Sequence, residues 1–272
     1  MHALDSIRNQ IYSPVRALVL DANEPNSIYS LGLQEDLAEY PEVDYRKVDP
    51  MLSIAGIRNL ALSYMEGEYI AYLSSKDTWD SAKVLLQIEQ LKEEREAAAS
   101  CSNGVLVDKR RAQVAVEPLA GHMTSDASKW VLDNPAKMSA QVLYRRSALM
   151  EEGGFDEKFI NFCDGDMLLR LSRKNKVLLL PVSLCECCIT PEDEDYDWNN
   201  FKDSQYLRNK YMELFLVNRR MTLRFYERMM HLARLNYLWL NYLIYAFFYF
   251  IKAPGHTIFK LFRRIYQMAG YM

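Results

Sequence analysis

The stretch from Gly67 to Ala82, GEYIAYLSSKDTWDSA, constrains the fold more than any other part of the chain. It begins with Glu68 to Leu73, a short apolar and aromatic run typical of a buried strand. A polar turn, Ser74 to Asp77, follows, and the side-chain oxygen of Asp77 or Thr78 can accept from the free N–H groups of a helical first turn. The pattern predicts a strand, a turn and a helix, which places the turn at the carboxyl edge of a sheet, where open α/β sheets bind ligands.

Strand and helix patterns alternate on both sides of this stretch. Strands are expected at residues 15–20, 43–48, 139–144 and 176–180, the last ending at Pro181. Helices are expected at residues 28–40, 53–65, 78–99, 146–152 and 167–173. This alternation predicts an α/β fold, a Rossmann-like and mostly parallel sheet flanked by helices.

The charge of the chain is unevenly distributed. Residues 205–272 contain 11 Lys or Arg and 2 acidic residues, a net charge of +9, whereas the preceding 204 residues carry −12. An acidic body with a basic, aromatic tail favours an anionic surface as the partner of the tail and gives no indication of a nucleic-acid partner.

Five cysteines and no secretory signal predict reduced thiols and a cytoplasmic protein. Three of the cysteines lie in Cys185-Glu186-Cys187-Cys188. A zinc site typically needs a second pair of ligands, which this sequence lacks, so buried thiols on a strand are the preferred interpretation.

Four segments resemble glycosyltransferase family 2, a family of nucleotide-sugar-dependent enzymes with the GT-A fold. They are residues 6–12, 18–21, 58–73 (Arg58-Asn59-Leu60 and Gly67 to Leu73) and 153–170 (Gly153-Gly154-Phe155-Asp156-Glu157 through Asp164-Gly165-Asp166 to Arg170). Their order and spacing match the family over roughly residues 3 to 190. The resemblance implies a transferase domain at residues 1–200 and a separate helical tail at residues 201–272.

The chain departs from the family at its start and near the nucleobase site. Members normally begin with a strand and a loop that help to hold the nucleotide, whereas this sequence starts at the helix that follows them. The domain is therefore expected to be truncated, to begin further upstream, or to fill the sheet edge with another element. The aspartate pair of the family reads Asp21-Ala22 here, so Asp21 either contacts the nucleobase or closes a turn.

The metal-binding D-x-D turn of the family reads Ser74-Ser75-Lys76, followed by Asp77. A divalent ion needs hard oxygen ligands, and Lys76 would repel it. Lys76 may therefore itself neutralise a diphosphate, which gives metal-independent transfer, or the donor site has decayed. A metal-reaching histidine of the family would align near Thr190, so manganese or magnesium is not expected as a cofactor.

The acceptor-side motif supplies the catalytic candidates. The resemblance implies that Asp164 removes the proton of the acceptor hydroxyl, with Asp166 as a weaker candidate. The alternative is that Asp164 caps a helix and Asp166 interacts with the helix dipole. Arg58 either contacts the donor diphosphate or is a solvated helix residue. Together with Asp21, Lys76 and Asp77, it completes the expected donor-binding set.

The tail is helical in pattern at residues 206–230. Residues 237–251 carry no charge, yet they are fewer than the roughly 20 apolar residues of a membrane span. Residues 256–266 form a basic amphipathic pattern. These features suit helices in the headgroup region of a membrane. A spanning hairpin and packing against the body or a second subunit are the alternatives.

These features predict a glycosyltransferase that moves a sugar from a nucleotide-sugar to a hydroxyl of a glycan or lipid-linked acceptor, in polysaccharide biosynthesis at the inner face of the membrane. The alternative is a non-catalytic glycosyltransferase-like subunit that binds a glycan or a partner enzyme. Homo- or hetero-oligomers are compatible with either.

Overall fold

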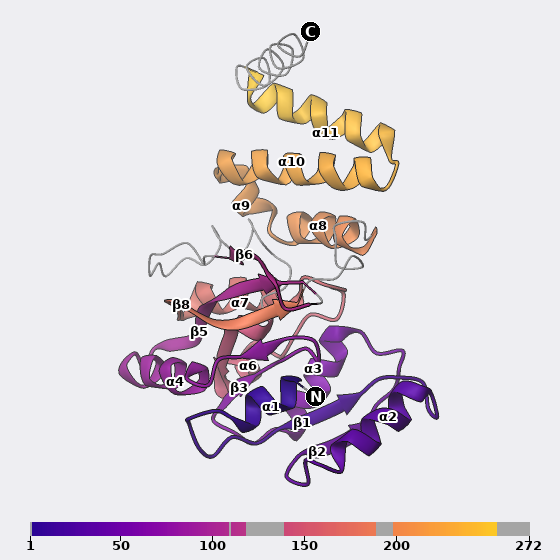
Figure 1. Ribbon diagram of the computed structural model, residues 1–272. Helices are drawn as coiled ribbons and strands as arrows, with labels where there is room; N and C mark the ends of the chain where they lie inside the picture. The colour runs from indigo at the N-terminus through magenta and orange to yellow at the C-terminus, as the bar shows by residue number, and fades with distance from the viewer. Residues whose placement is uncertain (1, 109, 118–138, 189–197, 255–272) are drawn as a thin grey trace. The chain divides into compact units, whose positions relative to one another are not determined.

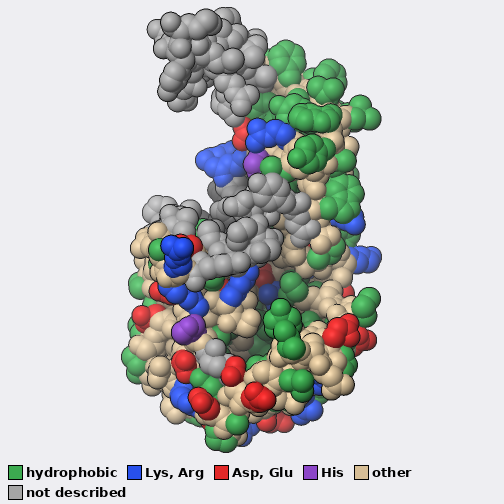
Figure 2. Space-filling model, turned by 45° about the vertical axis from the view of Figure 1, so that its right-hand side comes forward, with side chains coloured by type: hydrophobic (Ala, Val, Ile, Leu, Met, Phe, Trp, Pro, Cys, Tyr) green, Lys and Arg blue, Asp and Glu red, His purple; other side chains and the backbone are tan. Residues whose placement is uncertain are grey.

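The computed structural model describes residues 2–108, 110–117, 139–188 and 198–254. The chain divides into two compact units, residues 1–191 and residues 192–272. The first unit contains strands and helices, whereas the described part of the second is helical (Figure 1). On the face drawn in Figure 2, acidic side chains gather on the first unit and apolar side chains on the helices of the second.

The first unit opens with α1 (His2–Arg8), β1 (Leu18–Asp21), α2 (Ile28–Leu37), β2 (Asp44–Lys47), α3 (Ile54–Tyr64), β3 (Tyr69–Ala71), β4 (Thr78–Trp79) and α4 (Lys83–Glu93). It continues with β5 (Ala97–Val107), β6 (Gln113–Glu117), a 3-10 turn η1 (Ser139–Gln141), β7 (Val142–Arg145), α6 (Arg146–Glu151), α7 (Cys163–Lys174) and β8 (Lys176–Cys188).

The strands confirm the predicted α/β class but correct the predicted strand directions. One sheet has the order β3-β7-β5-β8-β4, with β6 also paired to β5, and β1 pairs with β2 separately. Among the described strands, only β1–β2 and β5–β8 are parallel pairs; the other four pairs are antiparallel. Alternation predicts parallel pairing only where a helix joins two neighbouring strands. The connection from β5 to β6 spans only five residues, which fixes that pair as antiparallel.

The predicted helix over residues 78–99 is wrong at both ends. Thr78 and Trp79 form β4, which pairs antiparallel with β8. The helix α4 starts at Lys83, where Gln10 Oε1 accepts from the amide of Val84 at 3.0 Å in place of a local cap. At the other end, Ala97 and its two neighbours belong to β5 and are at most 2% exposed. Alanine favours a helix, but here its small size suits the crowded centre of the sheet, so packing overrides propensity.

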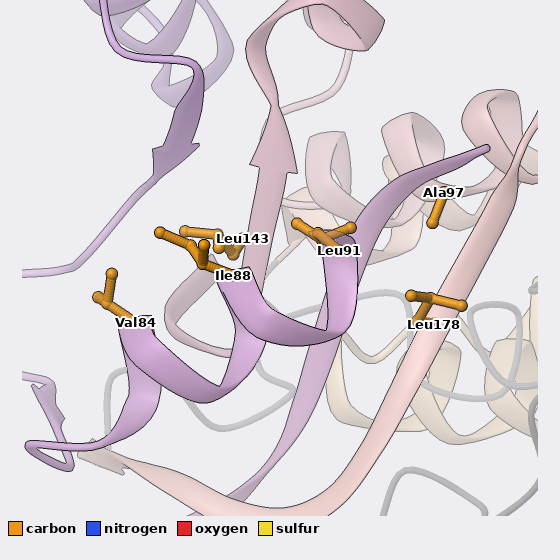
Figure 3. Packing of buried hydrophobic residues seen from close by; sticks show 6 residues of the cluster. All are labelled: Val84, Ile88, Leu91, Ala97, Leu143 and Leu178. Atoms are coloured by element: carbon orange, nitrogen blue, oxygen red, sulfur yellow. The ribbon is translucent and has the colours of Figure 1, made fainter. Parts of the chain in front are cut away.

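A hydrophobic cluster joins α4 to the sheet (Figure 3). Its members are Val84, Ile88 and Leu91 of α4, Ala97 of β5, Leu143 of β7 and Leu178 of β8. The three α4 residues recur at a spacing of three to four and thus share one helix face. Their burial fixes α4 against the strands that carry the site.

The strand β8 runs past Pro181, where the sequence predicted its end. Leu180 pairs with Ser102 and Ser183 with Asn103, so Pro181 and Val182 form a bulge. Proline is tolerated at a bulge because no ladder hydrogen bond is needed from its nitrogen. The thiols of residues 185, 187 and 188 are buried on this strand, as predicted, and Cys185 Sγ lies 4.0 Å from Cys187 Sγ.

The second unit contains α8 (Trp198–Lys210), α9 (Met212–Val217), α10 (Arg219–Leu235) and α11 (Trp239–Lys252). Arg219, at the start of α10, donates to the carbonyl of Lys252, at the end of α11, so the two helices run antiparallel. Among the residues placed by the structure, no helix combines the length and apolar character needed to cross a bilayer. The pattern predicted at residues 256–266, like Thr190, lies outside the described residues.

Candidate functional site

The structure brings together two predicted site residues that are over a hundred positions apart in the sequence. Arg58 lies on α3, whose first turn is capped by Ser53, and Asp164 lies in the first turn of α7. Nη1 of Arg58 is 2.5 Å from Oδ1 of Asp164 and 3.0 Å from Sγ of Cys163. The two charged side chains are 11% and 4% exposed. Arg58 is therefore not a solvated helix residue but half of a buried ion pair.

Aromatic rings surround this pair. The guanidinium carbon of Arg58 lies 5.4 Å from the ring centres of both Tyr72 and Phe155. Tyr144 meets Phe155 edge-on, at 6.3 Å and an interplanar angle of 90°. Burial alone would lower the pKa of Arg58, but the charge of Asp164 outweighs it and holds the pKa above its ordinary value. Arg58 is thus a permanent cation in a desolvated, aromatic surrounding.

Asn59, the neighbour of Arg58, clamps the double-glycine turn ahead of α7. Its Oδ1 accepts from the amide of Phe155 at 2.7 Å, and its Nδ2 donates to the carbonyl of Phe155 and to Glu157. Gly153 and Gly154 adopt positive φ angles of 74° and 79°. Two consecutive residues of α3 therefore fix the segment that leads to Asp164. The sequence interpretation gave Asn59 no role, and its position beside Arg58 was the only signal.

Asp166 lies in a different environment from Asp164. Its Oδ2 accepts from Nε of Arg170, one helical turn later, at 2.9 Å, and its side chain is fully buried. Arg170 in turn donates to the carbonyls of Glu152 and Gly154, at 2.7 and 2.6 Å. These contacts tie Asp166 to the support of the double-glycine turn.

Asp21 ends β1, as predicted, and is surrounded by hydrogen-bond donors. Oδ1 accepts from the backbone and side-chain nitrogens of Asn23, and Oδ2 from Ser30, Tyr45 and Lys47 at 2.6, 2.8 and 3.0 Å. Burial alone would raise the pKa of Asp21, but hydrogen bonds from Ser30, Asn23, Lys47 and Tyr45 hold that pKa well below its ordinary value. The carboxylate links β1, α2 and β2.

The turn after β3 carries Lys76 and Asp77. Oδ1 of Asp77 accepts from the amide of Cys188 at 2.9 Å, which ties the turn to the end of β8. Arg111 donates from Nη2 to the carbonyl of Lys76 at 2.9 Å, and its Nη1 lies 3.6 Å from Glu186. Arg111 thus adds a second cation at this turn. The sequence interpretation missed it, although it belongs to the basic run at residues 109–111.

The side chains of this turn do not fit a divalent cation. Ser74 and Ser75 supply neutral hydroxyls, Lys76 supplies a positive charge, and one oxygen of Asp77 is engaged by a backbone amide. Within the part of the chain that the structure describes, no group of three His, Cys, Asp or Glu side chains is arranged to hold a metal. No step of the reaction is therefore assigned to a metal ion.

A family model described as glycosyltransferase-like family 2 matches residues 5–188. The chain belongs to this family. No curated protein sequence matches it. The match confirms the resemblance drawn from the four sequence segments and covers the first unit, including Arg58, Asp164 and the turn at Lys76.

Solved structures show that this family 2 chain has the GT-A glycosyltransferase fold. TarS of S. aureus (residues 1–349) gives a TM-score of 0.62 at 12% identity, covering 86% of this chain and 68% of that one. The same protein in complex with UDP-GlcNAc gives 0.56 at 13%, covering 86% and 76%. The mannosyltransferase PcManGT from Pyrobaculum calidifontis, in complex with GDP-Man and Mn2+, gives 0.54 at 14%, covering 94% and 82%.

Proposed function

We propose that this family 2 chain transfers a sugar from a nucleotide-sugar donor to a hydroxyl of a glycan or lipid-linked acceptor, without a divalent metal. The observation that carries the proposal is the buried contact between Arg58 and Asp164, which joins the expected donor-binding helix to the expected acceptor-side motif. Family membership supports the transferase class, and two structural neighbours contain UDP-GlcNAc and GDP-Man.

The donor diphosphate would be neutralised by side chains. Lys76 supplies a compact cation at the turn where the family places its metal ligands, and Arg111 lies beside it. Arg58 supplies the third positive charge, from α3. Asp77 holds the turn against β8, and Asp21 orders the strands next to it. Cations close to the leaving diphosphate stabilise the charge that develops on it as the glycosidic bond breaks.

Asp164 would act as the general base. It accepts the proton of the acceptor hydroxyl while that oxygen attacks the anomeric carbon and the nucleoside diphosphate leaves. Asp166 is proposed as a positioning residue that acts through Arg170 and the double-glycine turn.

The second unit is proposed to attach the enzyme to the inner face of the membrane, where a lipid-linked acceptor would be found. One face of α11 is apolar and exposed; it consists of Leu240, Leu243, Ile244, Phe247 and Ile251, which are 43–72% exposed. Basic residues of the tail would add attraction to anionic headgroups.

Calorimetric titration with UDP, GDP and their sugars, with and without manganese, tests the donor part. Binding that is indifferent to manganese and is weakened by Lys76→Ala supports the proposal. Binding that requires manganese contradicts its metal-independent form. Absence of binding under every condition favours the alternative of a non-catalytic subunit.

The variant Asp164→Asn tests the catalytic part. It should abolish transfer and preserve the fold, because asparagine has the same shape and cannot accept the proton. The matched control is Glu94→Gln, which removes a carboxylate from an exposed pair with Lys176 and should leave transfer unchanged. Full transfer by the Asp164 variant would exclude this residue as the base.

A further inference from the structure

The proposed function assigns Arg58 to the donor diphosphate, yet in the structure this side chain is occupied by Asp164. The pair is buried, and Nη1 of Arg58 also contacts Sγ of Cys163. A buried cation cannot fully compensate two anions at different places at once. Donor binding through Arg58 therefore requires Asp164 to lose at least part of its partner.

Tyr144 provides a second, independent observation at the same place. Its side chain is fully buried on β7, and its hydroxyl has no hydrogen-bond partner among the residues that the structure describes. Burial raises the pKa of Tyr144 well above its ordinary value, and the charge of Asp164 raises it further. The hydroxyl thus stays protonated and lies within the field of that carboxylate. A buried donor without an acceptor is costly and rare, which points to a state of the protein in which it has one.

We infer that Arg58 is exchanged between Asp164 and the donor diphosphate, and that the Tyr144 hydroxyl replaces it as the hydrogen-bond donor to Asp164. This inference rests on the proposed function. In the free protein Arg58 is bound to Asp164 and Tyr144 is unsatisfied. In the donor complex Arg58 contacts phosphate oxygens and Tyr144 donates to the carboxylate.

The exchange is physically balanced. A diphosphate carries more negative charge than one carboxylate, so it attracts the guanidinium more strongly, and bidentate contacts to phosphate oxygens suit its planar geometry. Asp164 would otherwise be left buried without a partner, which is strongly unfavourable. A hydrogen bond from Tyr144 reduces this cost and leaves Asp164 without its cation, free to accept the proton of the acceptor. The base is thus released only when the donor is bound.

The first test measures UDP and GDP affinity by calorimetry in charge variants of the pair. Asp164→Asn removes the competing anion, so it should bind the nucleotide about tenfold tighter than the wild type, the equivalent of one charge-assisted hydrogen bond no longer lost on binding. Arg58→Met alone strands a buried carboxylate and can fail to fold. The double variant Arg58→Met, Asp164→Asn removes both charges and should lose the gain and bind more weakly than the wild type.

The second test examines Tyr144→Phe. If the hydroxyl acts only in the donor complex, its removal should leave urea stability of the free protein unchanged or higher, and weaken nucleotide binding several-fold. The matched control is Tyr249→Phe in the second unit, whose hydroxyl donates to Glu227 at 2.8 Å. That variant should show the opposite result, lower stability and unchanged nucleotide affinity.

Failure of the inference is distinguishable from failure of the proposed function. If the wild type binds neither nucleotide, the proposed donor is wrong and the exchange falls with it. If the wild type binds but Asp164→Asn binds no tighter, or Tyr144→Phe binds as well as the wild type, the exchange is overturned while the donor assignment stands.

Discussion

Gly154 lies so close to Asn59 that a Cβ atom on the glycine would stand 2.6 Å from Oδ1 of the asparagine. The same Oδ1 accepts from the amide of Phe155 at 2.7 Å, so Asn59 has little freedom to retreat. The φ angle of Gly154 is +79°, which disfavours a side chain independently of this contact. The helix that carries Arg58 is therefore locked to the turn that precedes Asp164 by the absence of one side chain.

Gly154→Ala is expected to lower the free energy of unfolding by about 2–4 kcal/mol, because it adds left-handed backbone strain and displaces Asn59. Urea unfolding monitored by fluorescence measures this change. Gly32→Ala is the control, since a Cβ at Gly32 would meet nothing within 4 Å in the middle of α2. That variant should be about 0.5–1 kcal/mol more stable than the wild type. Equal effects of the two substitutions would contradict the locked turn.

The hydrogen bonds around Asp21 predict a loss of stability in acid. The folded-state pKa of Asp21 lies below its unfolded value of 3.8. Its contribution is therefore fully present above about pH 5 and decreases as the pH falls through 4 and below. Asp21→Asn should reduce the free energy of unfolding by about 2–3 kcal/mol at pH 7, and the gap to the wild type should narrow toward pH 3. Denaturation measured from pH 3 to 7 checks this, and a constant gap would refute it.

Lys83 predicts a change on the alkaline side. Its side chain is fully buried, contacts the Trp79 ring at 4.5 Å and donates to Gln87 at 2.6 Å. Burial lowers the pKa of Lys83 from 10.5 to about 8. The unfolded chain therefore binds this proton more tightly than the folded one, so burying the ammonium costs about 3 kcal/mol below pH 8, and this cost disappears as the pH rises toward 10.5.

The comparison of wild type with Lys83→Met isolates this group. Between pH 7 and 10 the wild type should gain about 2–3 kcal/mol relative to the variant, because only the wild type loses the buried charge. Other groups titrate equally in both proteins and cancel. Urea unfolding at a series of pH values gives the difference directly, and a difference that does not vary with pH would show that Lys83 is not buried as an ammonium ion.

The exposed face of α11 predicts binding to anionic vesicles. Replacing Leu243 and Phe247 together by Glu removes two exposed apolar side chains and adds two negative charges. Co-sedimentation with phosphatidylserine-containing vesicles should fall at least tenfold, and binding of the wild type should weaken with added salt. Val182→Glu changes an exposed apolar residue of the first unit and should bind as the wild type does. Wild-type protein that ignores such vesicles would refute membrane attachment.

The sequence by itself determined the family and the local elements. Short apolar runs marked β1 and β3, and Ser53 marked the start of α3 through its capping hydroxyl. These features depend on neighbouring residues, so periodicity and capping chemistry are sufficient to read them. The family segments also identified Arg58 and Asp164 as separate candidates, because each lies in a motif of its own.

Only the tertiary structure decided how these pieces meet. The pairing of Arg58 with Asp164 and the link from Asp166 to the double-glycine turn join elements that are distant in the sequence. The strand at Ala97 and the mixed directions of the sheet also depend on neighbours that local patterns do not name. Burial converts propensity into strand or helix according to what surrounds a segment, and an ion pair forms only where packing removes both charges from water. Those surroundings arise from the whole fold, so no local reading of the chain contains them.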